Sequence, residues 1–341
     1  MCPAKQKPIA FDVGFCFVWK YNFLMRYLRW VFLTILVGLA ITKLYPHFHD
    51  FSQVWELKNN INYYFLAIGI FAQSGQYIGD GWLSQTILKI INVEMKFKNS
   101  VKIASLNVLA AHLFPVGEVG SISAAYYFYK KLGISTQSFI FLSVCWSAIT
   151  FSTLLAIFIA SMFFIPHLPY LNFKLIATIT VTIVISLIAA ALIFHKFIWH
   201  KIREKSAKFE IVRELIEFKR NITFYKKALL SHKLLLFEAI LACLVYYGTN
   251  ILTLSFSFLT FGLSPSLPLV TFAYALSLWS GVVTLSPAGL GAAEATMILI
   301  FLGYGLDPAK SLAVVLVFRL ITFWIPIPAG LLSYLSLKKH L

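Results

Sequence analysis

Four ionisable residues stand inside otherwise apolar stretches of this sequence, where a charge is costly and is therefore a candidate for function. They are Asp80, Glu118, Glu294 and Arg319. The guanidinium group of an arginine matches a phosphate in shape and charge, and a carboxylate could hold a cationic headgroup or a proton. These residue types indicate a binding site for a charged ligand. A purely structural Glu294–Arg319 ion pair is the competing interpretation.

Asp80 shares one helical face with three other polar residues. Gln73, Gln76 and Ser84 recur around it at helical spacing. Such a stripe would face neighbouring helices or a wet cavity rather than lipid. Hydrogen bonds between helices explain the same pattern equally well.

Two short segments rich in proline and glycine interrupt apolar runs, and Glu118 and Glu294 follow them. The segments contain, in chain order, Pro115, Gly117, Pro287, Gly289 and Gly291. A helix that restarts after such a break presents unpaired N–H groups and a positive dipole end, which suit a phosphate. A glutamate there could instead cap these N–H groups. Proline and glycine could also merely kink ordinary membrane helices.

The composition indicates that a lipid bilayer surrounds the elements that carry these residues. Hydrophobic residues make up 60% of the chain and charged residues 12%, whereas soluble domains have about 45–50% and about 25%. We expect an all-α polytopic membrane protein, a single transmembrane domain over residues 1–341, with about six full spans of roughly 20 residues and two broken helix pairs. The full spans are expected at Trp30–Tyr45, Ile61–Ile91, Ser138–Phe164, Leu171–Phe197, Leu234–Phe261 and Ser311–Leu337. The broken pairs are expected at Val101–Phe114 with Val119–Tyr129 and at Leu267–Leu285 with Ala292–Leu302.

The basic residues between the spans predict which side each segment faces. If each broken pair enters and leaves on one side, 24 Lys and Arg residues fall on one side and 4 on the other, with Arg319 inside the last span. Because basic residues remain on the cytoplasmic side, we expect both termini in the cytoplasm of a protein of the inner or plasma membrane.

The two halves of the chain have the same order of elements. Pro115 and Pro287 lie 172 positions apart, and the same offset places Gly133 on Gly305. The first repeat is expected at 24–164 and the second at 171–337. Three full crossings per half would insert the halves in opposite orientations. Inverted repeats with broken helices are typical of transporters.

The segment 198–233 between the repeats is rich in Lys, Arg and Glu, with apolar residues at helical spacing. It predicts a basic amphipathic helix on the cytoplasmic membrane surface, or a solvated connector with charge pairs along the helix. The net charge of +16 is distributed between apolar spans, so anionic lipid headgroups are expected as partners and nucleic acid is not. The four cysteines form no CxxC pair, and we expect neither a metal nor a cofactor.

The second break and the span that follows it resemble a known family. Ser286-Pro287-Ala288-Gly289-Leu290-Gly291-Ala292-Ala293-Glu294, followed by Arg319-Leu320-Ile321-Thr322-Phe323-Trp324, is similar to the pattern of the lysylphosphatidylglycerol synthase transmembrane-region family. This family includes the flippase domain of the bacterial multiple peptide resistance factor. Phe114-Pro115-Val116-Gly117-Glu118 resembles the family's first motif in shortened form, with serines where the family has an arginine. The resemblance extends from about Leu24 to Leu337 and implies translocation of lipids between leaflets.

The residues and the resemblance together predict a flippase-like protein. Its cargo would be a charged lipid, either aminoacylated or linked to a polyprenyl phosphate. The alternative is a membrane subunit of a lipid-modifying or glycosyl-transferring enzyme complex, with a glycosyltransferase or an aminoacyl-transferase as partner. No HExxH, GxSxG or Walker motif is present, so we expect no catalytic residues in the chain itself. A structural scaffold is the third possibility.

Overall fold

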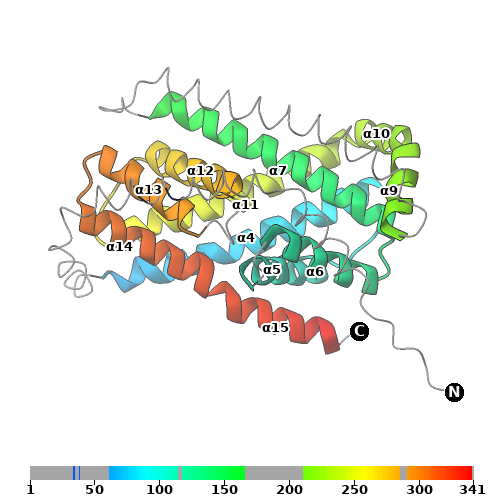
Figure 1. The fold of residues 1–341 in the computed structure, drawn as a ribbon, viewed down its shortest axis with the longest axis horizontal. Coiled ribbons are helices and arrows are strands. Elements are labelled where there is room, and N and C mark those ends of the chain that lie inside the picture. The colour runs from blue at the N-terminus through cyan, green and yellow to red at the C-terminus, as the bar shows by residue number, and fades with distance from the viewer. Residues whose placement is uncertain are drawn as a thin grey trace.

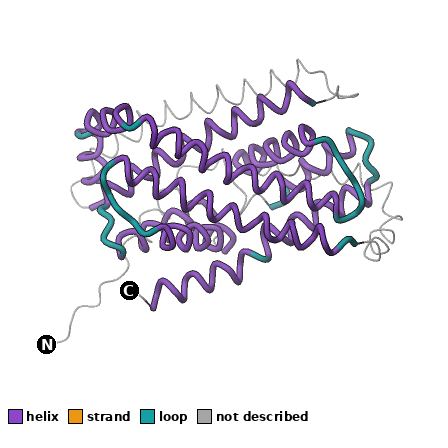
Figure 2. The backbone as a smooth tube through the Cα atoms, turned by 180° about the vertical axis from the view of Figure 1, so that it is seen from behind, coloured by secondary structure: helices purple, strands orange, loops and turns teal. Residues whose placement is uncertain are grey.

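The computed structural model describes residues 61–113, 117–165, 210–284 and 290–339, together with Thr34 and Gly38, and these residues are helical or lie in the turns between helices (Figures 1 and 2). The first half contributes α4 (Tyr63–Ile90), α5 (Phe97–Leu113), α6 (Gly117–Lys131) and α7 (Thr136–Phe164). The short helices α9 (Glu210–Arg220) and α10 (Ile222–Ser231) follow. The second half contributes α11 (Lys233–Leu259), α12 (Leu267–Thr284), α13 (Ala292–Gly303), α14 (Pro308–Arg319), a π-helix (Leu320–Trp324) and α15 (Pro326–Lys339).

Three helices in the described part of the chain are long and apolar enough to cross a membrane. They are α7, α11 and the continuous run Pro308–Lys339 that joins α14, the π-helix and α15. Helix α4 has 28 residues, which is long enough to cross, but polar residues in its middle lower its hydropathy. The spans expected at Trp30–Tyr45 and Leu171–Phe197 lie outside the described residues, so the total of six spans stays a prediction.

Local sequence explains where the helices begin and end. The side chain of Asn62 accepts a hydrogen bond from the backbone N–H of Tyr64 at 3.1 Å and caps α4. Asp307 caps α14 in the same way, by accepting from the N–H of Lys310 at 3.0 Å. Gly133 and Gly305 have φ values of 83° and 77°, and glycine adopts this left-handed conformation at little cost. The two glycines therefore form equivalent turns before α7 and α14.

The core of the molecule is the crossing of α4 and α11, which are in close contact along their length. They run antiparallel: Asn62 before α4 bonds to Thr260 after α11, and Thr86 near the end of α4 bonds to Glu238 near the start of α11. Small residues make this possible. A Cβ atom added at Gly79 would lie 2.6 Å from the backbone nitrogen of Tyr246, and one at Gly75 would lie 2.4 Å from Cγ2 of Thr249. Gly75 and Gly79 form the GxxxG spacing that lets membrane helices approach closely.

The two pairs of short helices lie at opposite ends of the molecule. In Figure 1, α5 and α6 occupy the half that also contains α9, α10 and the end of α15, whereas α12 and α13 occupy the other half. Each pair packs against the last long helix of the other half of the chain, α5 against α15 and α12 against α7. The chain therefore exchanges contacts between its halves rather than folding as two separate units.

The connector predicted at 198–233 is helical over its described part. Glu217 Oε2 of α9 accepts a hydrogen bond from Nε2 of Gln137 at 2.7 Å. The rings of Phe218 and Tyr225 stack at 4.7 Å, and Phe141 of α7 stacks on Tyr225 at 5.0 Å. These contacts hold α9 and α10 against the start of α7 and leave basic side chains exposed. The division of the chain into repeats and connector at the expected boundaries stays a prediction.

The close approach of α4 and α11 makes Gly79 sensitive to a single added methyl group. We expect Gly79→Ala to lower the free energy of unfolding by about 1–3 kcal/mol, because the new Cβ meets backbone that can yield only if the helices separate. The measurement is unfolding of the purified protein in detergent micelles. Gly248→Ala on α11 is the matched control: its Cβ would meet nothing within 4 Å, so stability should stay unchanged or rise by up to about 1 kcal/mol. Equal stability of the Gly79→Ala protein and the wild type would contradict this packing.

Candidate functional site

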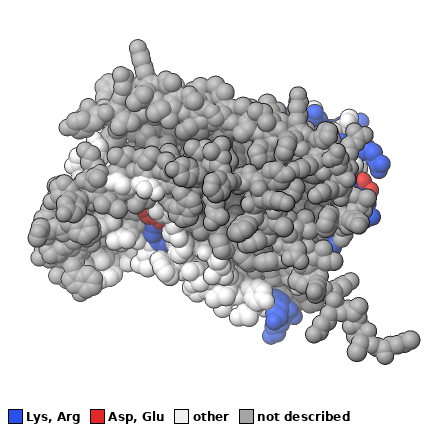
Figure 3. Space-filling view, in the orientation of Figure 1, with Lys and Arg blue, Asp and Glu red and all other residues white. Residues whose placement is uncertain are grey.

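Two of the predicted site residues form an ion pair. Nε of Arg319, the last residue of α14, lies 2.7 Å from Oε1 of Glu294 in the first turn of α13, and their side chains are 17% and 20% exposed. Figure 3 shows an acidic and a basic patch side by side over α13 and α14, the helices that carry this pair. The charges are thus neutralised within the protein and yet open to its surface.

The ion pair leaves hydrogen-bonding capacity unused. Oε2 of Glu294 is buried and has no hydrogen-bond partner among the described residues. The Nε–H of Arg319 is close to the carboxylate but does not make an aligned hydrogen bond to it. A charge-assisted bond is strong only when it is well aligned. The pair is therefore primarily an electrostatic contact that a better-matched anion could replace.

Arg319 stands directly before the π-helix Leu320–Trp324, which the sequence analysis did not predict. Its wide turn is closed by the N–H of Ile325, which donates to the carbonyl of Leu320 at 3.2 Å. Pro326 has no N–H and would crowd the carbonyl four residues earlier in a regular α-helix, so a local widening relieves the conflict. Short π-helical turns are frequent at functional sites.

His112, at the end of α5, reaches the same region from the first half of the chain. Its ring stacks on Phe323 of the π-helix, with the ring centroids 4.3 Å apart. Its Nδ1 is buried and has no hydrogen-bond partner among the described residues. From the sequence, we expect His112 to be a packed polar residue, and its ring stacking agrees with this. Its position also joins the end of α5 to the helix that follows Arg319.

The two glutamates that follow the breaks occupy the first turns of their helices. Helix α6 begins at Gly117, so Glu118 lies in its first turn, although its side chain is not described. Gly291 precedes α13 with a φ of 83°, which glycine tolerates, and it places Glu294 at the positive end of the helix dipole. Three further residues of the predicted breaks lie outside the described part of the chain: Pro115, Pro287 and Gly289.

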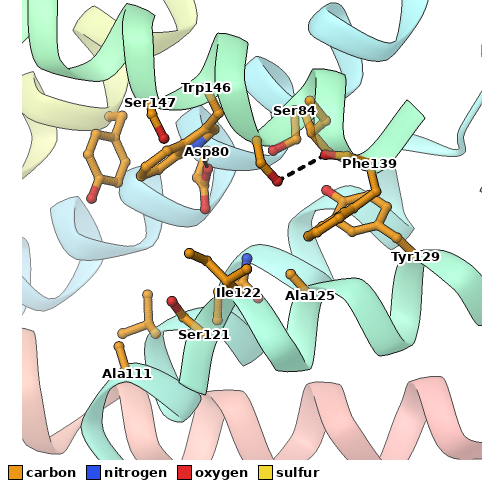
Figure 4. A pocket seen from close by; sticks show the side chains of 15 residues that line it. Asp80, Ser84, Ala111, Ser121, Ile122, Ala125, Tyr129, Phe139, Trp146 and Ser147 are labelled. Carbon is orange, nitrogen blue, oxygen red and sulfur yellow. Dashed lines mark hydrogen bonds between the residues drawn. The ribbon is translucent and has the colours of Figure 1, made fainter. Parts of the chain in front are cut away.

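Asp80 lies elsewhere, in the wall of a cavity of about 190 Å³ between α4, α5, α6, α7 and α11 (Figure 4). Its Oδ1 accepts a hydrogen bond from the indole Nε1 of Trp146 at 2.6 Å, and its side chain is 8% exposed. Ser84 lines the same cavity. The other two members of the predicted stripe, Gln73 and Gln76, are hydrogen-bonded to each other and do not line it. Only part of the stripe therefore faces a cavity.

Glu238 of α11 is a further carboxylate in a membrane span that the sequence analysis did not single out. Its Oε1 accepts hydrogen bonds from Nε1 of Trp82 at 2.6 Å and from Oγ1 of Thr86 at 3.1 Å. Both donors belong to α4, so the contact reinforces the crossing of α4 and α11. The sequence does contain a signal that could have identified Glu238: it is an acidic residue near the start of a long apolar run.

The sequence is similar to those of known membrane proteins. The family model described as the lysylphosphatidylglycerol synthase TM region matches residues 31–330. A UPF0104 membrane protein of Methanocaldococcus jannaschii is 24% identical over 270 residues, which cover 75% of this chain and 79% of the relative. A UPF0104 membrane protein of Pyrococcus horikoshii is 30% identical over 158 residues, or 46% of each chain.

The partly buried ion pair predicts a measurable coupling. Either Glu294→Gln or Arg319→Gln leaves one charge without its partner, so each should destabilise the protein. The double variant should lose less stability than the two single variants lose together. We expect a coupling free energy of about 1–2 kcal/mol from the double-mutant cycle of unfolding in micelles. Arg220→Gln on the exposed surface of α9 is the control and should be additive with Glu294→Gln. Additivity of the Glu294 and Arg319 changes would mean that the pair contributes nothing.

Proposed function

This chain belongs to the lysylphosphatidylglycerol synthase transmembrane-region family, and we propose that it moves a charged lipid between the two leaflets of its membrane. The cargo is a lipid with a phosphate in its headgroup, either aminoacylated or linked to a polyprenyl chain. The contact between Arg319 and Glu294 is the observation that carries this proposal.

The ion pair has the properties that a transient phosphate site needs. A lone arginine within a membrane span is costly, and Glu294 supplies the compensating charge when no lipid is bound. A lipid phosphate offers the guanidinium two acceptor oxygens in a fork geometry that the observed contact through Nε alone does not use. We therefore propose that the phosphate displaces Glu294 from Arg319 and that the carboxylate returns when the lipid leaves. Because the pair is partly exposed, a headgroup can reach it from the side.

The pattern of helix contacts supports an inverted repeat around this site. A two-fold axis in the membrane plane that relates α4 to α11 would also relate the pair α5–α6 to α12–α13, and α7 to the run from α14 to α15. The antiparallel crossing of α4 and α11 fits such an axis, as do the reciprocal contacts of α5 with α15 and α12 with α7. We propose that the two breaks approach the middle of the membrane from opposite sides. His112 and Glu294 would then bring both of them to Arg319.

We propose that the chain is not itself an enzyme. Any chemistry that builds the headgroup would come from a partner, such as a glycosyltransferase or an aminoacyl-transferase. If the chain is instead the membrane subunit of such a complex, its deletion should remove the modified lipid altogether. Under the translocation proposal, deletion removes only the copy of that lipid in the outer leaflet.

The positions of the basic residues support cytoplasmic termini. Exposed Lys and Arg lie over α9, α10 and the end of α15, which are at one end of the molecule (Figure 3). This clustering matches the preference of basic residues for the cytoplasmic face and for anionic headgroups.

Arg319 should be required for lipid movement. In vesicles with a fluorescent phosphatidylglycerol, the wild-type protein should speed exchange between leaflets, measured by the fraction of label that an impermeant reductant quenches. We expect Arg319→Ala to slow this exchange about tenfold or more, because it removes charge-assisted bonds to the phosphate. Arg319→Lys should retain part of the rate. Arg220→Ala is the control and should behave as wild type. A wild-type rate for Arg319→Ala at equal protein level would refute the proposal.

The orientation can be checked with single cysteines in a chain whose four native cysteines have been replaced. Ser264→Cys, in the exposed loop between α11 and α12, should react with an impermeant maleimide in intact cells. Lys338→Cys at the end of α15 should react only after the membrane is permeabilised. The opposite pattern would reverse the topology.

A further inference from the structure

The cavity beside Asp80 has an unusual charge balance for a space within a membrane protein. One carboxylate lines it, and none of the described residues that line it is Lys, Arg or His. The Asp80 side chain is more than nine-tenths buried. A buried charge without an opposite charge is costly, so proteins usually pair it or bind an ion there. Among the described residues that line the cavity, no side chain supplies the balancing charge.

The hydrogen bonds of the described residues leave one acceptor free in the wall of the cavity. Trp146 donates to Oδ1, and this is the hydrogen bond that fixes the carboxylate. Asn107 on α5 also lines the cavity, and its buried Oδ1 has no hydrogen-bond partner among the described residues. Figure 4 shows Asp80 directed from α4 toward α5 and α6. The Asp80 carboxylate and the Asn107 carbonyl oxygen, on different helices, thus lie in the wall of one space, and the Asn107 oxygen has no donor among the described residues.

We propose that this cavity is a binding site for a small monovalent cation, separate from the phosphate site at Arg319. The ligand is an ammonium-sized group that Asp80 neutralises and that Asn107 and serine hydroxyls coordinate. Trp146 and Tyr129 contribute aromatic walls, which favour a cation through their ring electrons. A volume of about 190 Å³ holds such a group with its attached stem or with water.

The site is next to the phosphate site but does not overlap it. Ala111 lines the cavity, whereas the neighbouring His112 stacks on Phe323 beside Arg319. The end of α5 therefore separates the cavity that Asp80 lines from the contact that contains Arg319. The cation can have two sources: a free ion that moves with the lipid, or an amine in the headgroup. The idea that the cation accompanies a lipid rests on the proposed function. The idea that a cation binds in the cavity does not.

Binding is measured on the purified full-length protein in neutral detergent, as the midpoint of thermal unfolding against cation concentration. The probes are sodium chloride and methylammonium chloride for a free ion, with N-methylglucamine chloride at equal ionic strength as the bulky reference. For a headgroup amine, micelles doped with phosphatidylethanolamine are compared with micelles doped with phosphatidylglycerol. We expect a saturable rise in the unfolding midpoint in one of these arms, which identifies the source.

Asp80→Asn keeps the shape of the side chain and removes its charge. It should therefore raise the cation concentration at half-saturation by about tenfold or more. Asn107→Leu keeps the volume, removes the free carbonyl and should weaken binding less; it also serves if Asp80→Asn fails to fold. Glu238→Gln is the matched control, because Glu238 is likewise held by an indole N–H at 2.6 Å but does not line the cavity. It should bind as wild type does.

The outcomes separate this site from the proposed function. A saturable response that Asp80→Asn weakens and Glu238→Gln retains supports the site, even if Arg319→Ala leaves lipid exchange unchanged. The absence of a saturable response in every arm overturns it, as does a response that persists when Asp80 and Asn107 are each replaced. The measurement requires no lipid movement, so failure of the cation site leaves the translocation proposal intact.

Discussion

The crossing of α4 and α11 is the contact on which the other helices depend. Its closeness results from glycines on α4 that admit the backbone of α11, with Gly79 nearest to Tyr246. On another side of α4, Gly81 meets the backbone of Val101 and brings α5 equally close. In a membrane there is little hydrophobic gain from helix association, so such van der Waals contact is a main source of stability. This crossing also fixes the positions of Asp80, which lines the cavity, and of Glu238.

The placement of charge follows from the low dielectric of the bilayer. Three described carboxylates in the membrane each have a partner from another helix. Trp146 donates to Asp80 and Trp82 donates to Glu238, whereas Arg319 forms an ion pair with Glu294. Indole N–H groups donate a hydrogen bond without bringing a positive charge. Asp80 and Glu238 therefore have no opposite charge among the hydrogen-bond donors that the structure describes for them, whereas the Glu294–Arg319 contact combines two opposite charges. This difference separates a cavity suited to a cation from a contact suited to an exchangeable anion.

Much of the local structure could be predicted from the sequence. Apolar length and the Pro-Gly segments place most limits of the described helices near the observed ones, and Gly133 and Gly305, which the offset aligns, form the same kind of turn. The family assignment is confirmed by the match over residues 31–330. The π-helix after Arg319 was not predicted, because proline in a membrane span is compatible with several local distortions. The stripe around Asp80 was only partly informative, since Gln73 and Gln76 bond to each other.

The sequence by itself determined that this chain is a helical membrane protein, where most helices begin and end, and which few charges enter the apolar spans. These properties depend on hydropathy and on residues that are neighbours along one helix. Only the tertiary structure decided which charges meet, that Asp80 lines a cavity, that Glu238 holds α4, and that His112 reaches the helix after Arg319. The reason is physical: partners from different helices are chosen by crossing geometry and close packing, which a pattern along one helix does not encode.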